Sequence, residues 1–231
     1  MQMNFQDPIS PNMEAMIYFH DFLNMILIMI MTIILYNYIY IMFNKFTFRY
    51  LIHGHLMELI WTIIPIFILI IIAIPSMKIL YFTEDIFLPL MTVKVIGNQW
   101  FWTAEYHDMI INKTFNEPLS IEMYMTSTIK KNTFRLLETD EHMVLPTNSF
   151  IRLITTSEDV IHSFSMPSMG IKIDSIPGRL NQSFLYSSQA GMFFGQCSEI
   201  CGLGHSFMPI TIEFVSKEYF LNWLIYKMEN M

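Results

Sequence analysis

The segment of residues 195–209, GQCSEICGLGHSFMP, concentrates side chains that bind soft metal ions. Cys197, Cys201, His205 and Met208 have the spacing C-x3-C-x3-H-x2-M, and the chain has only these two cysteines. Thiolate, imidazole and thioether groups together select copper over calcium or magnesium. A disulfide, or a pair of unreactive buried thiols, would explain the cysteines but neither the histidine nor the methionine. We therefore interpret the segment as a metal-binding loop.

His162 is the best candidate for a further ligand from upstream in the chain. Copper sites of the cupredoxin type add one histidine from a strand far upstream of the ligand loop. His162 directly follows a predicted strand, whereas the other upstream histidines flank apolar segments or lie among polar residues. We expect His162 to complete the ligand set of the loop.

The second cysteine distinguishes this set from that of a blue copper site, which uses one cysteine, two histidines and an axial methionine. Two thiolates can bridge two copper ions, with one histidine terminal on each ion and with Met208 and a backbone carbonyl as weak outer ligands. Such a centre suits electron transfer, and the sequence shows no open position or general base for hydrolysis. A membrane-tethered mononuclear cupredoxin and a copper-delivery protein remain as alternatives.

Two charge-free apolar segments precede the metal-binding loop, at Phe22–Phe43 and Leu59–Met77. At about 1.5 Å of rise per residue, a helix of either segment approaches or exceeds the thickness of a bilayer core. Pro65 and Pro75 interrupt the second segment, which transmembrane helices tolerate. The first segment lacks the basic start and small-residue cleavage site of a signal peptide. We therefore predict a two-helix transmembrane hairpin over residues 22–80.

The charges around the hairpin predict its orientation. The loop between the helices carries Lys45 and Arg49 and no acid, whereas the arm of residues 1–21 carries three acids and no base. The positive-inside rule places the loop on the cytoplasm-like side. Both termini, and with them the domain of residues 81–231, are expected on the outer side, in a periplasm or an intermembrane space.

Residues 81–231 have the pattern of an all-β domain that ends in one amphipathic helix, Lys217–Met228. The segment Met91–Tyr106 has a strand-like composition, and Trp100 and Trp102 would share one face of a continuous strand. Many short strands separated by turn signals predict a β-sandwich or barrel. The other predicted strands are Phe150–Ser157, Gly170–Ile176, Gln182–Tyr186, Met192–Gly195 and Pro209–Val215.

The composition agrees with a chain that lies partly in a membrane and partly outside it. Hydrophobic residues make up 53% of the sequence and the mean hydropathy is +0.41, too apolar for an ordinary soluble domain. The net charge of −7 argues against a nucleic acid partner, which requires a basic surface. Because most of the acidic excess lies after residue 84, it favours a basic protein partner for the outer domain.

Together these motifs resemble subunit II of the haem–copper cytochrome c oxidases of mitochondrial type. The resemblance covers nearly the whole chain and implies a two-helix membrane hairpin followed by a cupredoxin-like, Greek-key β-domain. It implies a subunit that accepts electrons from reduced cytochrome c and passes them to haem a in subunit I, where oxygen reduction and proton pumping would occur. The motifs that carry it are ELIWT at 58–62, QWFW at 99–102, SEDVIHS at 157–163, DSIPGRLNQ at 174–182 and residues 195–209.

The resemblance implies a binuclear copper centre, CuA, with a magnesium ion beside it. The two cysteines would bridge the copper ions, and the Glu199 side chain would reach a magnesium ion shared with subunit I. The expected copper ligands are His162, Cys197, Glu199 (through its backbone carbonyl), Cys201, His205 and Met208.

The resemblance also implies roles outside the copper centre. Trp100 would be the point at which electrons enter. Glu58 would lie at the mouth of a proton channel in subunit I, although a carboxylate at a helix N-terminus also has a simpler reading as a helix-stabilising charge. The lysine-rich face of cytochrome c would dock on four acidic residues: Glu105, Asp140, Glu158 and Asp159.

The expected location is the mitochondrial inner membrane, with both termini and the copper domain in the intermembrane space. Asn98, Ala104 and His142 depart from the pattern of the family. These departures concern the docking surface for cytochrome c, whose details they leave open, and not the copper ligands.

Overall fold

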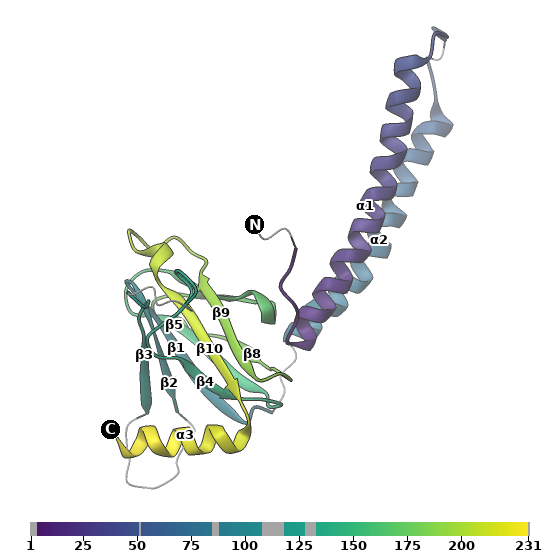
Figure 1. Cartoon of the computed structure of the whole chain (residues 1–231). Helices are drawn as coiled ribbons and strands as arrows, with labels where there is room; N and C mark the ends of the chain where they lie inside the picture. The colour runs from purple at the N-terminus through teal and green to yellow at the C-terminus, as the bar shows by residue number, and fades with distance from the viewer. Residues whose placement is uncertain (1–3, 51, 85–87, 108–117, 128–132, 231) are drawn as a thin grey trace. The chain divides into compact units, whose positions relative to one another are not determined.

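The computed structural model describes residues 4–50, 52–84, 88–107, 118–127 and 133–230 (Figure 1). The chain forms two compact units. One unit combines Met1–Glu14 with Glu84–Met231, and the other is Ala15–Thr83. Each unit has its own architecture and is described separately.

Two long helices, α1 (Pro11–Phe43) and α2 (His55–Glu84), run side by side as a hairpin (Figure 1). Among the described residues, these two helices are long and apolar enough to cross a membrane, by length and composition. Apolar side chains are exposed along both of them, as expected where lipid replaces water as the solvent. The predicted hairpin is confirmed, and α2 continues as a helix through Pro65 and Pro75.

Helix α1 begins well before the apolar segment, because Ser10 caps it. The Ser10 hydroxyl accepts the backbone N–H of Met13 at 3.1 Å, and Pro11 occupies the first helical position, which needs no N–H donor. The Ser10 hydroxyl in turn donates to the carbonyl of Met169 at 2.8 Å, and Ile9 N–H donates to Ser168 at 3.0 Å. The residues before α1 are therefore hydrogen-bonded to the β-domain through the Ser10 side chain and the Ile9 backbone.

The β-domain is a sandwich of two five-stranded sheets, with strand orders β3-β2-β1-β5-β8 and β4-β10-β9-β6-β7. This architecture is consistent with a cupredoxin-like fold and confirms the predicted fold class. Most neighbouring strands are antiparallel, but β1 pairs with β5 and β4 with β10 in parallel. The strands are β1 (Met91–Asn98), β2 (Phe101–Tyr106), β3 (Leu119–Met123), β4 (Met143–Pro146), β5 (Ile151–Ser157), β6 (His162–Met166), β7 (Ile171–Ser175), β8 (Asn181–Leu185), β9 (Gly191–Cys197) and β10 (Pro209–Val215).

The segment predicted as one strand from Met91 to Tyr106 is a hairpin of β1 and β2, with Gln99 and Trp100 in the turn. The expectation that Trp100 and Trp102 share a strand face is therefore wrong. Trp102 lies on β2, where alternate residues point into the sandwich, and it is fully buried. Its indole N–H donates to the carbonyl of Met208 at 3.2 Å, whereas Trp100 is only partly buried.

The closing helix α3 (Lys217–Glu229) confirms the predicted C-terminal helix and covers one end of the sandwich (Figure 1). Ser216 caps it by accepting the backbone N–H of Tyr219 at 3.3 Å. Phe220 and Leu224 are buried against the core, and the ring of Trp223 lies 5.7 Å from that of Tyr106. Because α3 follows the end of β10, the opposite end of the sandwich, where β10 begins, is left for the loops that carry the ligands.

Gly195 allows β9 and β6 to approach closely just before the metal-binding loop. A Cβ atom at Gly195 would overlap the carbonyl oxygen of Ser165 and the sulfur of Met166. We predict that Gly195→Ala lowers the free energy of unfolding by about 3 kcal/mol, the upper end of the usual range for overpacking. Thermal denaturation of the full chain in detergent, followed by tryptophan fluorescence, measures the change.

Gly178→Ala is the matched control. Gly178 has φ of +73° but nothing within 4 Å of its would-be Cβ, so alanine there should cost only the left-handed backbone conformation, about 1 kcal/mol. Equal losses of stability in the two variants would show that the contact with β6 is not tight.

Candidate metal centre

The predicted ligands meet at one end of the sandwich, where several chain segments converge. His162 is the first residue of β6, and Cys197 is the last residue of β9. These strands are neighbours in one sheet, with Phe164 paired with Cys197. Met208 directly precedes β10, the other neighbour of β9. Strand pairing therefore brings a histidine from upstream beside the loop.

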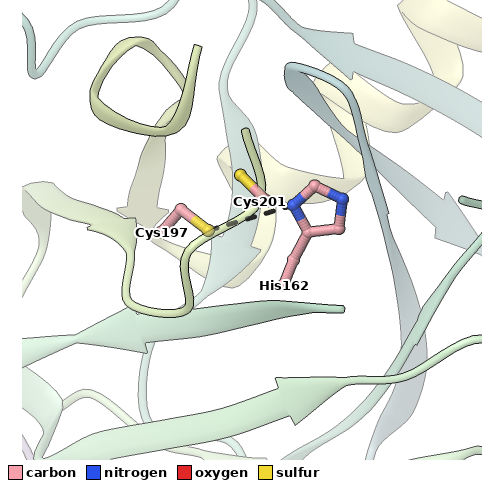
Figure 2. Close-up of side chains that lie close together, drawn as sticks. All are labelled: His162, Cys197 and Cys201. Carbon is pink, nitrogen blue, oxygen red and sulfur yellow. Dashed lines mark hydrogen bonds between the residues drawn. The ribbon is translucent and has the colours of Figure 1, made fainter. Parts of the chain in front are cut away.

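His162, Cys197 and Cys201 form the metal-ligand group of this site (Figure 2). One ligand atom from each lies within 4.8 Å of the other two. Among the residues that the structure describes, no other group of at least three His, Cys, Asp or Glu side chains meets this condition. The Cys197 sulfur points toward Nδ1 of His162 at 3.9 Å. All three residues are buried, and both cysteines are free thiols.

The remaining predicted donors surround the same two sulfur atoms. Nδ1 of His205 and the sulfur of Met208 each lie 3.5 Å from the Cys201 sulfur. The carbonyl oxygen of Glu199 lies 3.4 Å from the Cys197 sulfur. Two thiols, two imidazole nitrogens, a thioether and a carbonyl therefore face one small volume, which fits soft metal ions.

The two thiols have opposite electrostatic environments. Burial opposes ionisation of Cys197, but hydrogen bonds from His162 and from the backbone of Ser163 and Glu199 outweigh it and lower the pKa to about 6. Burial and the nearby charge of Cys197 raise the pKa of Cys201 to about 12. The Cys197 thiolate thus forms readily at neutral pH, and its negative charge opposes ionisation of the Cys201 thiol. A metal cation in the same place would favour both thiolates.

Asp159 contacts the outer nitrogen of the His162 ring. Its Oδ1 lies 2.8 Å from His162 Nε2, and its Oδ2 accepts the backbone N–H of Gln99 at 2.6 Å. Partial burial raises the pKa of this carboxyl group, but the hydrogen bonds from His162, Val160 and Gln99 outweigh burial and lower it. For His162, burial acts in the opposite direction and lowers the pKa of the imidazole. The contacts with Cys197 and Asp159 outweigh burial and raise this pKa overall.

Trp100 lies against the ligand loop. Its indole N–H donates to the carbonyl oxygen of Cys201 at 3.4 Å. A Cβ atom at Gly204 would overlap the Trp100 ring, and one at Gly202, where φ is +123°, would lie 3.1 Å from it. The two glycines therefore allow the indole to pack directly on the loop backbone.

Gln99 and Gly97 also belong to the site, and the sequence analysis missed both. The Gln99 side-chain amide donates to the carbonyl of Cys201 at 2.8 Å. A Cβ atom at Gly97 would lie 2.9 Å from the His162 ring. The polar Gln99 within a run of aromatic residues was the one sequence signal that could have indicated its role.

The four acidic residues expected at a docking surface differ in their surroundings. Glu105 is paired with Lys94 at 2.9 Å and is only 21% exposed in its side chain. Asp140 is exposed and accepts the backbone N–H groups of Tyr124 and Glu141, both at 2.8 Å. Glu158 is exposed, and the neighbouring Asp159 contacts His162.

Two of the residues that depart from the family pattern are buried. Ala104 is 0% exposed on β2, and Asn98 is 8% exposed at the end of β1, where its amide donates to Thr103 at 3.3 Å. Their side chains therefore lie within the domain and offer little surface to a docking partner. His142 is partly exposed and lies 3.6 Å from Glu213.

The carboxylates of two predicted residues are not among the donors that contact the two thiols. Glu199 is exposed, although its carbonyl faces the thiols. Glu58 lies in the first turn of α2, in the helical unit, with its carboxylate 3.6 Å from Nδ1 of His55. In the described part of the chain, neither carboxylate belongs to a second group of metal ligands.

Known proteins of one family match the chain. The family model described as "Cytochrome C oxidase subunit II, transmembrane domain" matches residues 1–79, and "Cytochrome C oxidase subunit II, periplasmic domain" matches residues 91–215. The cytochrome c oxidase subunit 2 of a Lasius species is 50% identical over 222 residues, 96% of each chain. That of Aedes aegypti is 47% identical over 224 residues, 96% of this chain and 95% of the relative.

A solved structure is similar to the β-domain. The crystal structure of the periplasmic domain of subunit II of cytochrome oxidase of Bradyrhizobium japonicum is 38% identical, with a TM-score of 0.57. The match covers 63% of this chain and 99% of that one.

The unequal thiols predict unequal reactivity in the metal-free chain. At pH 7 iodoacetamide should modify Cys197 much faster than Cys201, because only the thiolate is nucleophilic and the pKa of Cys197 is about 6. The rate for Cys197 should rise with pH through that value and then level off. Tandem mass spectrometry of the modified peptide measures each site.

In Cys197→Ser, Cys201 should react faster than it does in the unmodified chain, because a neighbouring negative charge is removed. Preferential modification of Cys201 in the unmodified chain would contradict the electrostatic assignment.

Proposed function

The chain belongs to the cytochrome c oxidase subunit II family, and on this basis we propose that it holds the binuclear copper centre CuA. Electrons from reduced cytochrome c would pass through this centre to haem a in subunit I. Oxygen reduction to water and the coupled pumping of protons would take place in subunit I. The family membership comes from matches over nearly the whole chain.

The convergence of the donors on two free thiols is the observation that carries the proposal. A mononuclear site needs one thiolate, but both sulfur atoms here lie within 4.8 Å of a shared imidazole nitrogen. Each thiol has its own neighbouring donors, His162 and Glu199 for Cys197 and His205 and Met208 for Cys201. When bound, a copper pair of this kind supplies one-electron chemistry shared between two metals. The ligand set fits two copper ions better than one.

The folded chain would hold these donors in fixed positions and exclude water from them. Three of the six donors, His162, Cys197 and Met208, lie at or next to the ends of paired strands. His162, both cysteines and Met208 are at most 8% exposed. A buried site with few mobile side chains and little water changes little when its charge changes. These properties favour fast electron transfer and disfavour bond-making chemistry.

Trp100 is proposed as the point at which electrons enter. It combines partial exposure with a hydrogen bond from its indole to the carbonyl of Cys201. This contact gives a short path from the surface to a bridging thiol. The acidic residues Glu105, Asp140, Glu158 and Asp159 are proposed to guide the lysine-rich face of cytochrome c toward it.

The remaining proposals concern the rest of the complex. The exposed Glu199 side chain would bind a magnesium ion together with subunit I, and Glu58 would lie at the mouth of a proton channel in that subunit. Helices α1 and α2 would cross the mitochondrial inner membrane, with the loop carrying Lys45 and Arg49 on the matrix side. The termini and the β-domain would lie in the intermembrane space, where cytochrome c is available.

Copper content and electron paramagnetic resonance test the proposal directly. The purified oxidase should contain two copper ions in this subunit, and its oxidised form should show the seven-line hyperfine pattern of one electron shared by two equivalent copper nuclei. Cys201→Ser should abolish that pattern, because a bridging thiolate is lost. A four-line spectrum with one copper per chain would support a mononuclear cupredoxin instead.

Trp100→Phe should slow the reduction of the copper centre by cytochrome c by about tenfold or more, equivalent to at least about 1.4 kcal/mol in the barrier. Phenylalanine keeps the aromatic packing but loses the indole N–H that contacts Cys201. Stopped-flow kinetics measure the rate, and the copper spectrum should be unchanged.

Trp223→Phe is the control for this variant, because Trp223 lies on α3 and packs against Tyr106, away from the ligand loop. Trp100 would lose its proposed role if both variants reacted with cytochrome c at the normal rate.

A further inference from the structure

The carboxylate of Asp159 makes four polar contacts beside the candidate metal centre. Its Oδ1 lies 2.8 Å from Nε2 of His162 and also accepts the backbone N–H of Val160 at 2.6 Å. Its Oδ2 accepts the backbone N–H of Gln99 at 2.6 Å. The hydroxyl of Ser157 lies 3.2 Å from Oδ1. Only 31% of the Asp159 side chain is exposed.

These contacts determine which nitrogen of His162 is available to a metal. Nδ1 faces the Cys197 sulfur, and Nε2 faces the carboxylate. A carboxylate accepts hydrogen bonds and cannot donate them when ionised, so Nε2 is the donor to Asp159, and Nδ1 is the nitrogen that a metal among the thiols would bind. Carboxylates that bind the outer nitrogen of a ligand histidine fix its tautomer and increase its basicity.

The ring has little freedom apart from this hydrogen bond. His162 is 0% exposed, and the space beside Gly97 is so narrow that a Cβ atom there would lie 2.9 Å from the ring. Trp102 packs edge-on with its ring centre 5.7 Å away. Asp159 supplies the directional contact that selects one orientation within this apolar slot.

The same carboxylate also holds the turn that bears Trp100. It binds the backbone of Gln99, whose side chain donates to the carbonyl of Cys201 at 2.8 Å. One acidic side chain therefore connects a ligand histidine, the turn before Trp100 and, through Gln99, the ligand loop.

The adjacent Glu158 provides a contrast within the same turn. It is exposed, and its carboxylate makes no hydrogen bond or ion pair with the residues that the structure describes. Its charge can act on a partner in solution but has no contact through which to act on His162.

We propose that Asp159 is a positioning residue of the metal centre, which fixes His162 with Nδ1 toward the thiols and anchors the Gln99–Trp100 turn on the ligand loop. This role is additional to any part that its charge plays in binding cytochrome c. The inference rests on the proposed copper site for its consequences, but the hydrogen-bond network exists in the chain itself.

Asp159→Asn and Glu158→Gln form a matched pair for testing the proposal, because each removes one negative charge from the same turn. In the purified oxidase, Asp159→Asn should raise the midpoint potential of the copper centre, since the oxidised form loses a nearby anion. It should also alter the copper hyperfine splitting and lower copper affinity by about 10- to 100-fold. Glu158→Gln should leave all three unchanged, although both variants can weaken cytochrome c binding at low salt.

Asp159→Glu covers the case in which the asparagine variant fails to fold. It keeps the charge but displaces the carboxylate by one methylene, so a positioning role predicts an altered hyperfine pattern with normal salt dependence of cytochrome c binding. If the copper potential, hyperfine pattern and copper affinity in the Asp159 variants match those of Glu158→Gln, the proposal is overturned and Asp159 is a docking residue alone.

The metal-free chain separates this proposal from the proposed function. In nuclear magnetic resonance spectra of the full chain in detergent, the Nε2–H proton of His162 should exchange slowly with solvent, and Asp159→Asn should speed this exchange while Glu158→Gln does not. Failure to find two copper ions in the unmodified oxidase would refute the copper assignment and leave this measurement intact. Equal exchange in the two variants would refute the positioning role whatever metal is bound.

Discussion

The mutual repulsion of two buried thiolates is the constraint on which the ligand end of the domain depends. Cys197 and Cys201 lie close together away from water, and ionisation of the first raises the pKa of the second. In the described structure, the donors around them are imidazole, thioether and carbonyl groups. A buried pair of this kind is stable as thiol and thiolate or, with both sulfurs ionised, around bound cations. A bound cation would relieve the repulsion between the two thiolates.

The sandwich provides the rigidity that this arrangement requires. Three of the donors lie at or next to the ends of β6, β9 and β10, which are adjacent in one sheet. Gly195 lets β9 approach β6, and Gly97 leaves room for the His162 ring. The positions of the donors are therefore set by backbone pairing and by close packing at these two glycines. Both resist small displacements.

Around the ligands, a layer of hydrogen bonds links the site to the surface. Asp159 binds the outer side of His162, and Gln99 and Trp100 both bind the carbonyl of Cys201. An acidic residue that composition alone assigns to partner attraction thus contributes to the geometry of the interior. Glu158 and Asp159 are neighbours in one turn, but only the Asp159 carboxylate contacts a residue of the ligand set in the described structure.

The sequence by itself was sufficient for features that depend on short-range patterns. The spacing of Cys197, Cys201, His205 and Met208 identified the ligand loop, charge-free segments predicted the two long helices, and an amphipathic pattern predicted α3. The tertiary structure alone decided which side chains meet across the chain. It placed Trp100 in a turn and Trp102 in the core, buried Asn98 and Ala104, and joined Asp159 to His162 and Gln99. Strand β6 (HSFSM) alternates serine with apolar residues, yet all five of its residues are buried, so its polar positions do not mark an exposed face. These outcomes depend on strand pairing between distant segments, and that pairing is determined by the packing of the whole sandwich rather than by local residue preference.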